Sequence, residues 1–366
     1  MKISAPAAAL DAATSLAVLP VDKKNDTPVR VAADRGVTFT VVNPRAAISI
    51  KATSAASIAE PGHAAVSAWR LAALLSGFNP RSAISIETGK TAMTIVSGEA
   101  CYCLPLLRDG PGALVIDPEI GRADLATADC LALFEVVAAA AADRARLYLN
   151  GVFMHNVGCQ LNAAGTDGTK ALCVSIASSD VLSTDNRLIV PTSTVTMLMR
   201  LLRQVKPERV LLRRSRAVFS ASSPGFEIVS GLIDAAFPDL QRALPRAGTD
   251  SASCQRVELL GALARLKAVA GGEFPLIGLE WIAGGPLRLC VARQPDVGAE
   301  PITAKTSGSA RKAFSMFELT ALIAEFSDTA ITLEASDRAL IIRQGSKLGA
   351  LAECSWHERE AAALSA

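Results

Sequence analysis

The stretch that decides the fold reads Val195-Thr196-Met197-Leu198-Met199-Arg200-Leu201-Leu202-Arg203-Gln204-Val205. Its apolar residues Leu198, Leu201, Leu202 and Val205 follow an i, i+3, i+4, i+7 spacing, which places them in one stripe along a helix. Because such a stripe is stable only when it is covered, the helix is expected to pack against other elements.

The same stripe occurs at 68–78 and at 316–326, so the chain contains three copies separated by about 120 residues. The matching columns are Leu71/Leu198/Leu319, Leu74/Leu201/Leu322, Leu75/Leu202/Ile323 and Phe78/Val205/Phe326. The spacing is close to one small domain per copy. It predicts three domains, at 1–118, 119–247 and 248–366.

Each copy continues into two strand-like segments that read as a hairpin. The segments are Ile84-Ser85-Ile86 and then Met93 in the first copy, Val210-Leu211-Leu212 and then Val218 in the second, and Ile331-Thr332-Leu333 and then Leu340 in the third. Alternating segments such as 39–42 and 47–50 are expected to supply further strands.

Each third also holds an earlier helix candidate, at 6–19, 127–143 and 253–270. In the second candidate Thr127 is the expected N-cap. Its core face is predicted to contain Leu131, Phe134, Val137 and Ala138. The predicted class is therefore α+β, with three similar domains that each pack two helices on antiparallel sheets.

The composition indicates a globular chain. It has 366 residues, of which 50% are hydrophobic and 20% are charged, and this length suits two or three domains. No apolar run reaches the roughly 18 residues of a membrane-spanning helix. The alanine-rich segment 5–20 follows a single basic residue, Lys2, and contains Asp11, which argues against a secretory signal. A cytoplasmic protein without a membrane partner is expected.

Reactive groups are few and scattered. The three histidines, His63, His155 and His357, are not part of a motif, so no catalytic residue is predicted. The eight cysteines are dispersed like reduced thiols in a core, and Cys101 and Cys103 form the only close pair. Without a second pair this spacing does not make a metal site, and no cofactor is predicted.

Two short motifs are better explained as turns. Gly89-Lys90-Thr91 resembles the end of a phosphate-binding loop, but Ile84 stands where that loop needs a glycine. It is predicted to be a hairpin turn. Thr166-Asp167-Gly168 is not followed by carboxylates at metal-ligand spacing and is likewise read as a turn.

Three blocks of the middle third carry a resemblance to a known family. They are Arg146-Leu147-Tyr148-Leu149-Asn150-Gly151, Gly165-Thr166-Asp167-Gly168 and Phe237-Pro238-Asp239-Leu240-Gln241-Arg242-Ala243-Leu244-Pro245. In spacing and position they resemble the bacterial DNA polymerase III beta subunit, the beta sliding clamp, and the flanking thirds match by pattern. The resemblance implies the DNA clamp fold and a head-to-tail homodimeric ring around double-stranded DNA.

The resemblance also implies a role in DNA replication as a DNA-binding processivity factor with no catalysis of its own. The implied partners are the DNA polymerase III alpha subunit, the clamp loader and other proteins that carry a clamp-binding motif. A ring that slides needs contacts with phosphates but no readout of bases, which would hold it in place. The net charge is only +2, so these contacts must come from a local basic surface.

Six residues are the candidates for DNA contact. By resemblance, Lys23 and Lys24 lie where the family has a DNA-contacting basic residue, and Arg146 and Tyr148 lie in its central-channel loop. Arg200 and Arg203 fall off the apolar stripe of their helix. They are either neighbours of phosphates or an ordinary solvated face.

The resemblance further implies a pocket for partner peptides and a dimer seam. The pocket would contain Leu149, Thr166, Gly168, Thr169, Lys170, Ala171, Pro238, Arg242 and Ala243. Thr169-Lys170-Ala171 replace the usual His-Arg-Leu, which predicts a wider and less apolar pocket. The seam would join Tyr102 and Leu104 of one chain to Ala268 and Val269 of the other. The last two are small, so the seam is expected to be weaker.

Two alternatives stay open. One is a divergent paralogue that serves as a scaffold for specialised or repair polymerases, favoured by the altered residues 169–171 and by the polar tail that begins near Trp356. The other is an enzyme of unrecognised fold, supported only by Cys101, Cys103 and His155.

Overall fold

The computed structural model describes residues 1–21, 26–143, 145–185, 187–239, 244–246, 248–270, 275–293 and 296–355. They form two compact units. Unit 1 combines Met1–Leu131 with Ser178–Asp234, and unit 2 combines Ala132–Ala177 with Ala235–Ala366. Each unit joins parts of two predicted thirds, and the domain boundaries at 118 and 247 stay a prediction.

Unit 1 begins with two helices and a set of short strands. These elements are β1 (Lys2–Pro6), α1 (Ala7–Ala17), β2 (Pro28–Ala33), β3 (Val37–Asn43), β4 (Ile48–Ser54), β5 (Ser57–Glu60), β6 (Gly62–Ser67), α2 (Ala68–Ser76), β7 (Ala83–Thr88), β8 (Ala92–Ser97) and β9 (Ala100–Pro105). After a linker come β10 (Gly121–Ala126), α3 (Thr127–Phe134), which continues into unit 2, β14 (Ile189–Pro191), α4 (Thr192–Val205), β15 (Arg209–Arg214), β16 (Val218–Ser223) and β17 (Phe226–Gly231).

Unit 2 follows the same plan of helices on strands. Its elements are the 3₁₀ helices η1 (Glu135–Ala139) and η2 (Leu147–Leu149), β11 (Gly151–Val157), β12 (Gln160–Thr166), β13 (Lys170–Ala177), β18 (Asp250–Gln255), α6 (Arg256–Val269), β19 (Leu276–Ile282), β20 (Leu287–Arg293), β21 (Asp296–Ile302), β22 (Ala304–Ser307), β23 (Ser309–Ser315), α7 (Met316–Ala324), β24 (Ala330–Ser336), β25 (Ala339–Gln344) and β26 (Lys347–Ala352).

In each unit one long antiparallel sheet runs through the predicted boundary between thirds. In unit 1 the order is β10-β15-β16-β17-β4-β3-β2-β6, and β17 pairs β4 with Ile228 opposite Ile50. In unit 2 the order is β11-β12-β13-β26-β25-β24-β18-β22, and β13 pairs β26 with Cys173 opposite Leu348. Smaller sheets complete the units, β5-β1-β7-β8-β9 in unit 1 and β21-β20-β19-β23 in unit 2.

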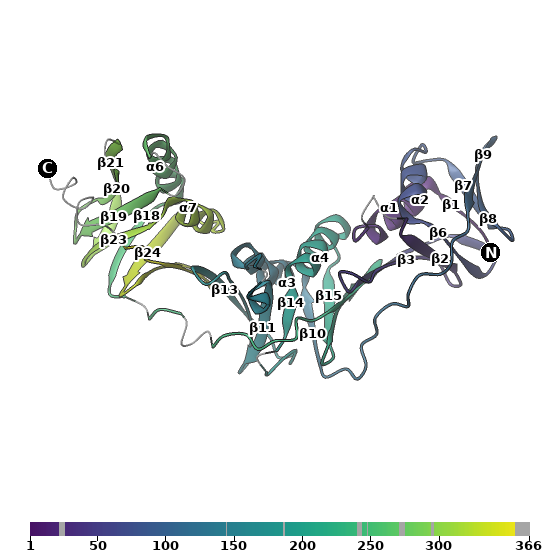
Figure 1. Cartoon of the computed structure of the whole chain (residues 1–366), viewed down its shortest axis with the longest axis horizontal. Coiled ribbons are helices and arrows are strands. Elements are labelled where there is room, and N and C mark those ends of the chain that lie inside the picture. The colour runs from purple at the N-terminus through teal and green to yellow at the C-terminus, as the bar shows by residue number, and fades with distance from the viewer. Residues whose placement is uncertain are drawn as a thin grey trace. The chain divides into compact units, whose positions relative to one another are not determined.

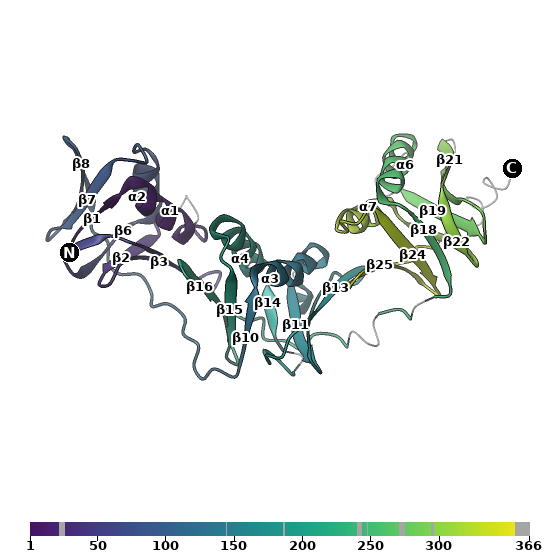
Figure 2. The same cartoon turned by 180° about the vertical axis from the view of Figure 1, so that it is seen from behind.

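The helices cover the sheets with the predicted apolar stripes. In unit 1, α1 and α2 lie side by side, and Leu10, Leu71 and Leu75 are buried with the strands in one apolar core (Figure 1). In unit 2, α6 and α7 are neighbours, as the view from behind also shows (Figure 2). Leu263 and Leu319 are buried there. The predicted α+β class is confirmed.

The three repeat helices are confirmed as α2, α4 and α7, and the strands that follow them as β7, β15 and β24. Leu198, Leu201 and Leu202 of α4 are all fully buried, as their spacing indicated. Gly89-Lys90-Thr91 is the predicted hairpin turn, since it joins β7 to β8 and the Gly89 N–H donates to the Ala92 carbonyl at 2.9 Å.

The helix predicted at 127–143 is wrong in extent and in part of its buried face. The α-helix ends at Phe134, and residues 135–139 form the tighter 3₁₀ helix η1. Phe134 is buried as predicted, but a 3₁₀ helix repeats every three residues, so η1 buries Val136 and Ala139 rather than Val137 and Ala138.

The ends of two predicted helices also differ. Thr127 is not an N-cap, because its hydroxyl donates to the Pro207 carbonyl and its N–H donates to Glu208. The helix predicted at 253–270 begins at Arg256, because 250–255 form β18, which pairs with β24 on one side and β22 on the other. Here strand pairing overrides the local helical pattern.

Candidate functional site

A cavity of about 380 Å³ lies in unit 2 beside the turn between β12 and β13. Its walls come from η2, from both strands at that turn, from β26 and from the segments 238 and 244–245. The lining residues are Arg146, Tyr148, Leu149, Thr166, Gly168, Thr169, Lys170, Ala171, Pro238, Leu244, Pro245, Arg338, Ala339, Ala350, Leu351 and Ala352. Apolar walls with a few polar groups suit a small ligand or a peptide segment.

The β12–β13 turn is fixed by its own side chains. Asp167 Oδ1 accepts the N–H groups of Thr169 at 2.8 Å and Lys170 at 2.9 Å, and also the Thr169 hydroxyl at 2.8 Å. The Thr166 hydroxyl donates to the Lys170 carbonyl at 2.6 Å. Burial acts to raise the pKa of Asp167, but these hydrogen bonds outweigh it and hold that pKa below its ordinary value.

Gly168 lets the turn approach the arginine of the cavity. Its φ is 94°, a left-handed value that side chains disfavour. A Cβ at this position would lie 2.7 Å from Nη1 of Arg146. The cavity wall therefore needs glycine here for both conformation and space.

Arg146 is held by the segment before η2. Its Nε lies 2.9 Å from Oδ2 of Asp143, and the Asp143 N–H donates to Oδ1 of Asn150 at 2.9 Å. A hydrogen bond from the Ala145 N–H, followed by that from Arg146, lowers the pKa of Asp143. These contacts fix η2, so Tyr148 and Leu149 meet the cavity from a defined direction.

Lys170 is tied to two carboxylates instead of projecting freely. Its Nζ lies 3.1 Å from Asp167 and donates to Glu318 of α7, and its side chain is only 15% exposed. Burial acts to lower the pKa of Lys170, but both carboxylates stabilise the cation and raise that pKa overall. Arg338 is exposed and forms no ion pair within the part of the chain that the structure describes. It is the cation of the cavity that is open to a ligand.

The floor of the cavity comes from strand pairing across the chain. Lys170 and Ala171 lie opposite Leu351 and Ala350, and the Ala352 N–H donates to the Thr169 carbonyl at 2.8 Å. The sequence prediction missed seven lining residues: Leu244, Pro245, Arg338, Ala339, Ala350, Leu351 and Ala352. Leu244 and Pro245 belong to a block already singled out, and the other five needed the β13–β26 and β25–β26 pairings.

The structure brings most of the predicted pocket residues together. Leu149, Thr166, Gly168, Thr169, Lys170, Ala171 and Pro238 all line this one cavity. Arg242 and Ala243 lie outside the described residues.

The residues predicted to contact DNA lie in different parts of the chain and do not all line one cavity. Arg146 and Tyr148 line the same cavity as the predicted pocket residues. Arg200 and Arg203 are exposed on α4 in unit 1. Lys23 and Lys24 lie outside the described residues, and so does Trp356.

The predicted seam residues are accessible in the single chain. Tyr102, 41% exposed, and the half-buried Leu104 lie on β9, the last strand of its sheet, where Tyr102 packs edge-on against Phe78 with ring centroids 5.6 Å apart. Val269, also 41% exposed, and Ala268 lie at the end of α6.

The described part of the chain contains no group of three or more His, Cys, Asp or Glu side chains arranged to hold a metal ion. His155 is stacked on Phe153 with ring centroids 4.8 Å apart, and burial lowers its pKa. Cys101 and Cys103 are free and exposed on β9. Among the same residues, no helix has the length and apolar character that crossing a bilayer requires.

Comparison with known proteins shows which family the chain resembles. Residues 131–239 match the model of the DNA polymerase III beta subunit, central domain. The beta sliding clamp of Pseudomonas putida is 26% identical over 236 residues, and that of Pseudomonas aeruginosa is 25% identical over 242. The chain is similar to the DNA polymerase III beta subunit family, at 25–26% identity to these two relatives. The first alignment spans 62% of this chain and 62% of its relative.

Solved structures of this family share the fold. The Pseudomonas aeruginosa DNA polymerase III subunit beta superposes with a TM-score of 0.89 at 20% identity, covering 97% of this chain and 100% of that one. The Caulobacter crescentus pol III beta superposes with a TM-score of 0.87, also at 20% identity and with the same coverage. The predicted clamp fold is thereby confirmed for the chain.

Proposed function

We propose that this chain is a sliding clamp that closes around double-stranded DNA as a head-to-tail homodimer and tethers a DNA polymerase during replication in the cytoplasm. The observation that carries the proposal is the cavity of unit 2. Three separate sequence blocks contribute to one pocket there, in a chain whose residues 131–239 match the model of the DNA polymerase III beta subunit, central domain. The chain acts as a processivity factor and performs no catalysis itself.

The pocket is proposed to hold the clamp-binding motif of partner proteins. Leu149, Leu244, Pro245 and Leu351 supply apolar walls on which an extended peptide can place apolar side chains. Arg338 is the residue that makes a polar contact with the bound peptide and orients it, since Arg146 and Lys170 already have carboxylate partners. The DNA polymerase alpha subunit and the clamp loader are the expected partners.

The contact with DNA is proposed to be electrostatic and independent of base sequence. Arg200 and Arg203 are exposed on α4, and Lys206 follows as its C-cap. Long cations on a helix reach phosphates through water without reading bases, which permits sliding. With Lys23, Lys24, Arg146 and Tyr148 they form the proposed DNA-facing set.

The experiment that tests this function measures retention on DNA. The purified chain, with a clamp loader and ATP, should remain on nicked circular DNA through gel filtration and should leave when the circle is cut. The proposal would be contradicted if the chain remained equally on circular and on cut DNA. It would also be contradicted if the chain stayed monomeric at micromolar concentration.

The basic helix can be tested separately. Replacing Arg200 and Arg203 with alanine is expected to weaken binding at low salt and to reduce the slope of log affinity against log salt by about 1 per arginine. The matched control replaces the exposed arginines Arg35 and Arg45, which sit at strand turns. An equal effect in the control would show general charge loss instead of a helix contact.

A second candidate function is a specialised paralogue that serves particular polymerases. It is favoured by Lys170, which Asp167 and Glu318 hold away from a ligand. Such a pocket would select partners differently from one in which Lys170 is free.

The Glu318→Gln variant tests this selection. It removes the charge of one of the two carboxylate partners of Lys170 and is expected to raise the affinity for an acidic clamp-binding peptide several-fold, because Lys170 then keeps only Asp167 as a carboxylate partner and can also contact the peptide. Fluorescence anisotropy with a labelled peptide measures it, and Glu325→Gln at the end of the same helix is the control. Unchanged affinity in both variants would remove the support for altered selection.

A further inference from the structure

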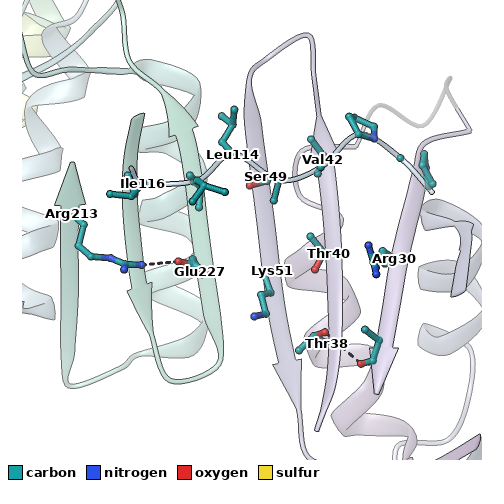
Figure 3. A pocket seen from close by; sticks show the side chains of 18 residues that line it. Arg30, Thr38, Thr40, Val42, Ser49, Lys51, Leu114, Ile116, Arg213 and Glu227 are labelled. Atoms are coloured by element: carbon teal, nitrogen blue, oxygen red, sulfur yellow. Dashed lines mark hydrogen bonds and ion pairs between the residues drawn. The ribbon is translucent and has the colours of Figure 1, made fainter. Parts of the chain in front are cut away.

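A second cavity, of about 510 Å³, lies in unit 1 (Figure 3). We call it the linker cavity. One wall is the face of the long sheet formed by alternate residues of β2, β3, β4 and β17, with Arg213 of β15. The other wall is the segment Gly110–Ile116, part of the linker between β9 and β10. Its volume is that of an ordinary small-molecule site, about 300–1,000 Å³.

The floor of the linker cavity carries a row of three donors. Arg30 lies opposite Thr40 in the β2–β3 register, and Thr40 lies opposite Lys51 in the β3–β4 register. The three side chains therefore lie side by side on neighbouring strands, as Figure 3 shows. Strands are about 4.8 Å apart, so Arg30 and Lys51 are separated by roughly 10 Å with the threonine hydroxyl between them. Both long side chains can reach an anion placed over Thr40.

These donors lack partners of their own. Arg30 and Lys51 form no ion pair, and the Thr40 hydroxyl no hydrogen bond, with any residue that the structure describes. The carboxylate on this face belongs to Glu227, which forms an ion pair with Arg213 at a distance of 2.9 Å. The lining therefore carries two uncompensated positive charges, which favour an anionic ligand.

The upper side of the cavity is apolar. Leu114 and Ile116 of the linker are half-buried against the sheet, and Val42 lies to one side of them on β3 (Figure 3). A ligand that satisfies both sides needs a negatively charged group and a short hydrocarbon body. A purely ionic ligand would leave this apolar edge without a partner.

The linker has the length to adjust around a ligand. It is anchored at Leu107, whose N–H donates to Ala65 of β6 at 2.8 Å, and at Ile120, whose N–H donates to Arg214 of β15 at 2.9 Å. Six strand spacings separate β6 from β15, or about 29 Å, whereas the 13 residue-to-residue steps from Leu107 to Ile120 can reach about 43 Å. The segment between the anchors is therefore not taut.

We propose that the linker cavity binds a small amphipathic anion, a carboxylate or phosphate monoester with a short alkyl or aromatic body. The anionic group lies over Thr40 between Arg30 and Lys51, and the body lies against Leu114 and Ile116. A ligand placed there contacts β2, β3 and β4 together with the linker, so it fastens the linker to the sheet.

The test uses three probes on the full chain in isothermal titration calorimetry: hexyl phosphate, inorganic phosphate and hexan-1-ol. Hexyl phosphate is expected to bind saturably with a stoichiometry of one, and each of the other probes at least about tenfold more weakly. The Arg30→Gln/Lys51→Gln variant should lose at least about tenfold in affinity for hexyl phosphate.

The matched control is Arg35→Gln/Arg45→Gln, which removes the same charge from strand turns that do not line the cavity. It should bind hexyl phosphate like the parent chain, and circular dichroism should show that both variants are folded. A second variant, Leu114→Ser, tests the apolar side and should weaken hexyl phosphate but not inorganic phosphate. Equal binding by the parent and Arg30→Gln/Lys51→Gln, or no saturable binding of hexyl phosphate, overturns the proposal.

Discussion

Gly168 is the residue on which the shape of the unit 2 pocket depends most directly. The Gly168→Ala substitution places a side chain at a φ of 94° and 2.7 Å from the Arg146 guanidinium. It is expected to lower the free energy of unfolding by about 1–3 kcal/mol and to displace Arg146. Urea unfolding measures the first effect, and peptide binding by anisotropy measures the second.

Gly112→Ala is the matched control, because a Cβ there has no neighbour within 4 Å and the φ is not left-handed. It should leave stability and binding unchanged. If Gly168→Ala bound peptide like the parent, the turn would not shape the pocket.

The Arg214–Asp185 pair gives unit 1 a pH-dependent contact. Arg214, whose side chain is only 4% exposed, donates from Nη1 to Asp185 Oδ1 at 3.0 Å and from Nη2 to Oδ2 at 2.9 Å. The hydrogen bond from Arg214, opposed by burial, lowers the pKa of Asp185 from 3.8 to about 2. A carboxylate with a lowered folded pKa stabilises the fold above its unfolded pKa. That stability is lost as the pH falls from about 4 through about 2.

The Asp185→Asn variant tests this pair. It leaves the buried Arg214 without its charge partner and is expected to lose about 1–2 kcal/mol at pH 7, with no further loss from this site in acid. Thermal unfolding as a function of pH measures both effects. The exposed pair Arg209–Asp124 supplies the control, and Asp124→Asn should cost less than about 1 kcal/mol. An equal loss in both variants would show that burial of Arg214 does not matter.

Individual residues of the pocket were only partly predictable. The turn residues Thr166 and Gly168 and the nearby Pro238 stand in the blocks that resemble the beta subunit family, and that resemblance selected them. Arg338 and Leu351 have no local signal: Leu351 reaches the cavity through the pairing of β26 with β13, and Arg338 through the pairing of β25, which it directly precedes, with β26. That register depends on which strands are neighbours, which a period in one segment does not reveal.

At the scale of elements, the close contact of β12 with η1 explains why the helix after Thr127 stops early. A Cβ on Gly165 would lie 2.2 Å from the carbonyl oxygen of Val136. The backbone of η1 therefore lies directly on the strand at a position where only glycine fits.

The Gly165→Ala substitution is expected to destabilise the chain by about 2–3 kcal/mol, because two backbone segments must move apart. Chemical denaturation checks the value. Gly89→Ala is the control, since its Cβ would meet only the Ala92 carbonyl at 3.6 Å, and it should change stability by less than about 0.5 kcal/mol. A small effect at Gly165 would mean that η1 adapts easily.

Helices with a clear stripe of apolar residues at helical spacing were predictable from the sequence, but the residues at which helices begin and end were not. Leu198, Leu201 and Leu202 fix α4 because burial and the helical period agree. Residues 253–255 carry no equally strong period, so the hydrogen bonds of β18 to both neighbours decide their conformation.

At the scale of the whole molecule, the proposed ring requires the exposed edge of β9. The Tyr102→Ala variant removes a large, partly exposed ring from that edge and is expected to weaken self-association by at least about tenfold. Sedimentation velocity across a concentration series measures this change. Val157→Ala on β11 removes another exposed apolar side chain and should leave association unchanged. A monomer–dimer equilibrium that Tyr102→Ala does not alter would exclude β9 from the seam.

Among the described residues, the triplicate pattern predicted the order and type of the elements well, but not how the sheets extend. The repeats fix helix and strand order because each copy has its own apolar stripe. The ladders β4–β17 and β13–β26 join strands that are far apart in sequence, and no spacing within one copy encodes them.

The ladder between β4 and β17 has a practical consequence for cleavage of the polypeptide. A protease that cuts after the exposed Arg108 breaks the covalent connection within the linker, yet Phe226–Ser230 still pairs with Ile48–Ala52. The two fragments are therefore expected to stay bound to each other as a noncovalent complex, and halves produced from separate genes should reassemble.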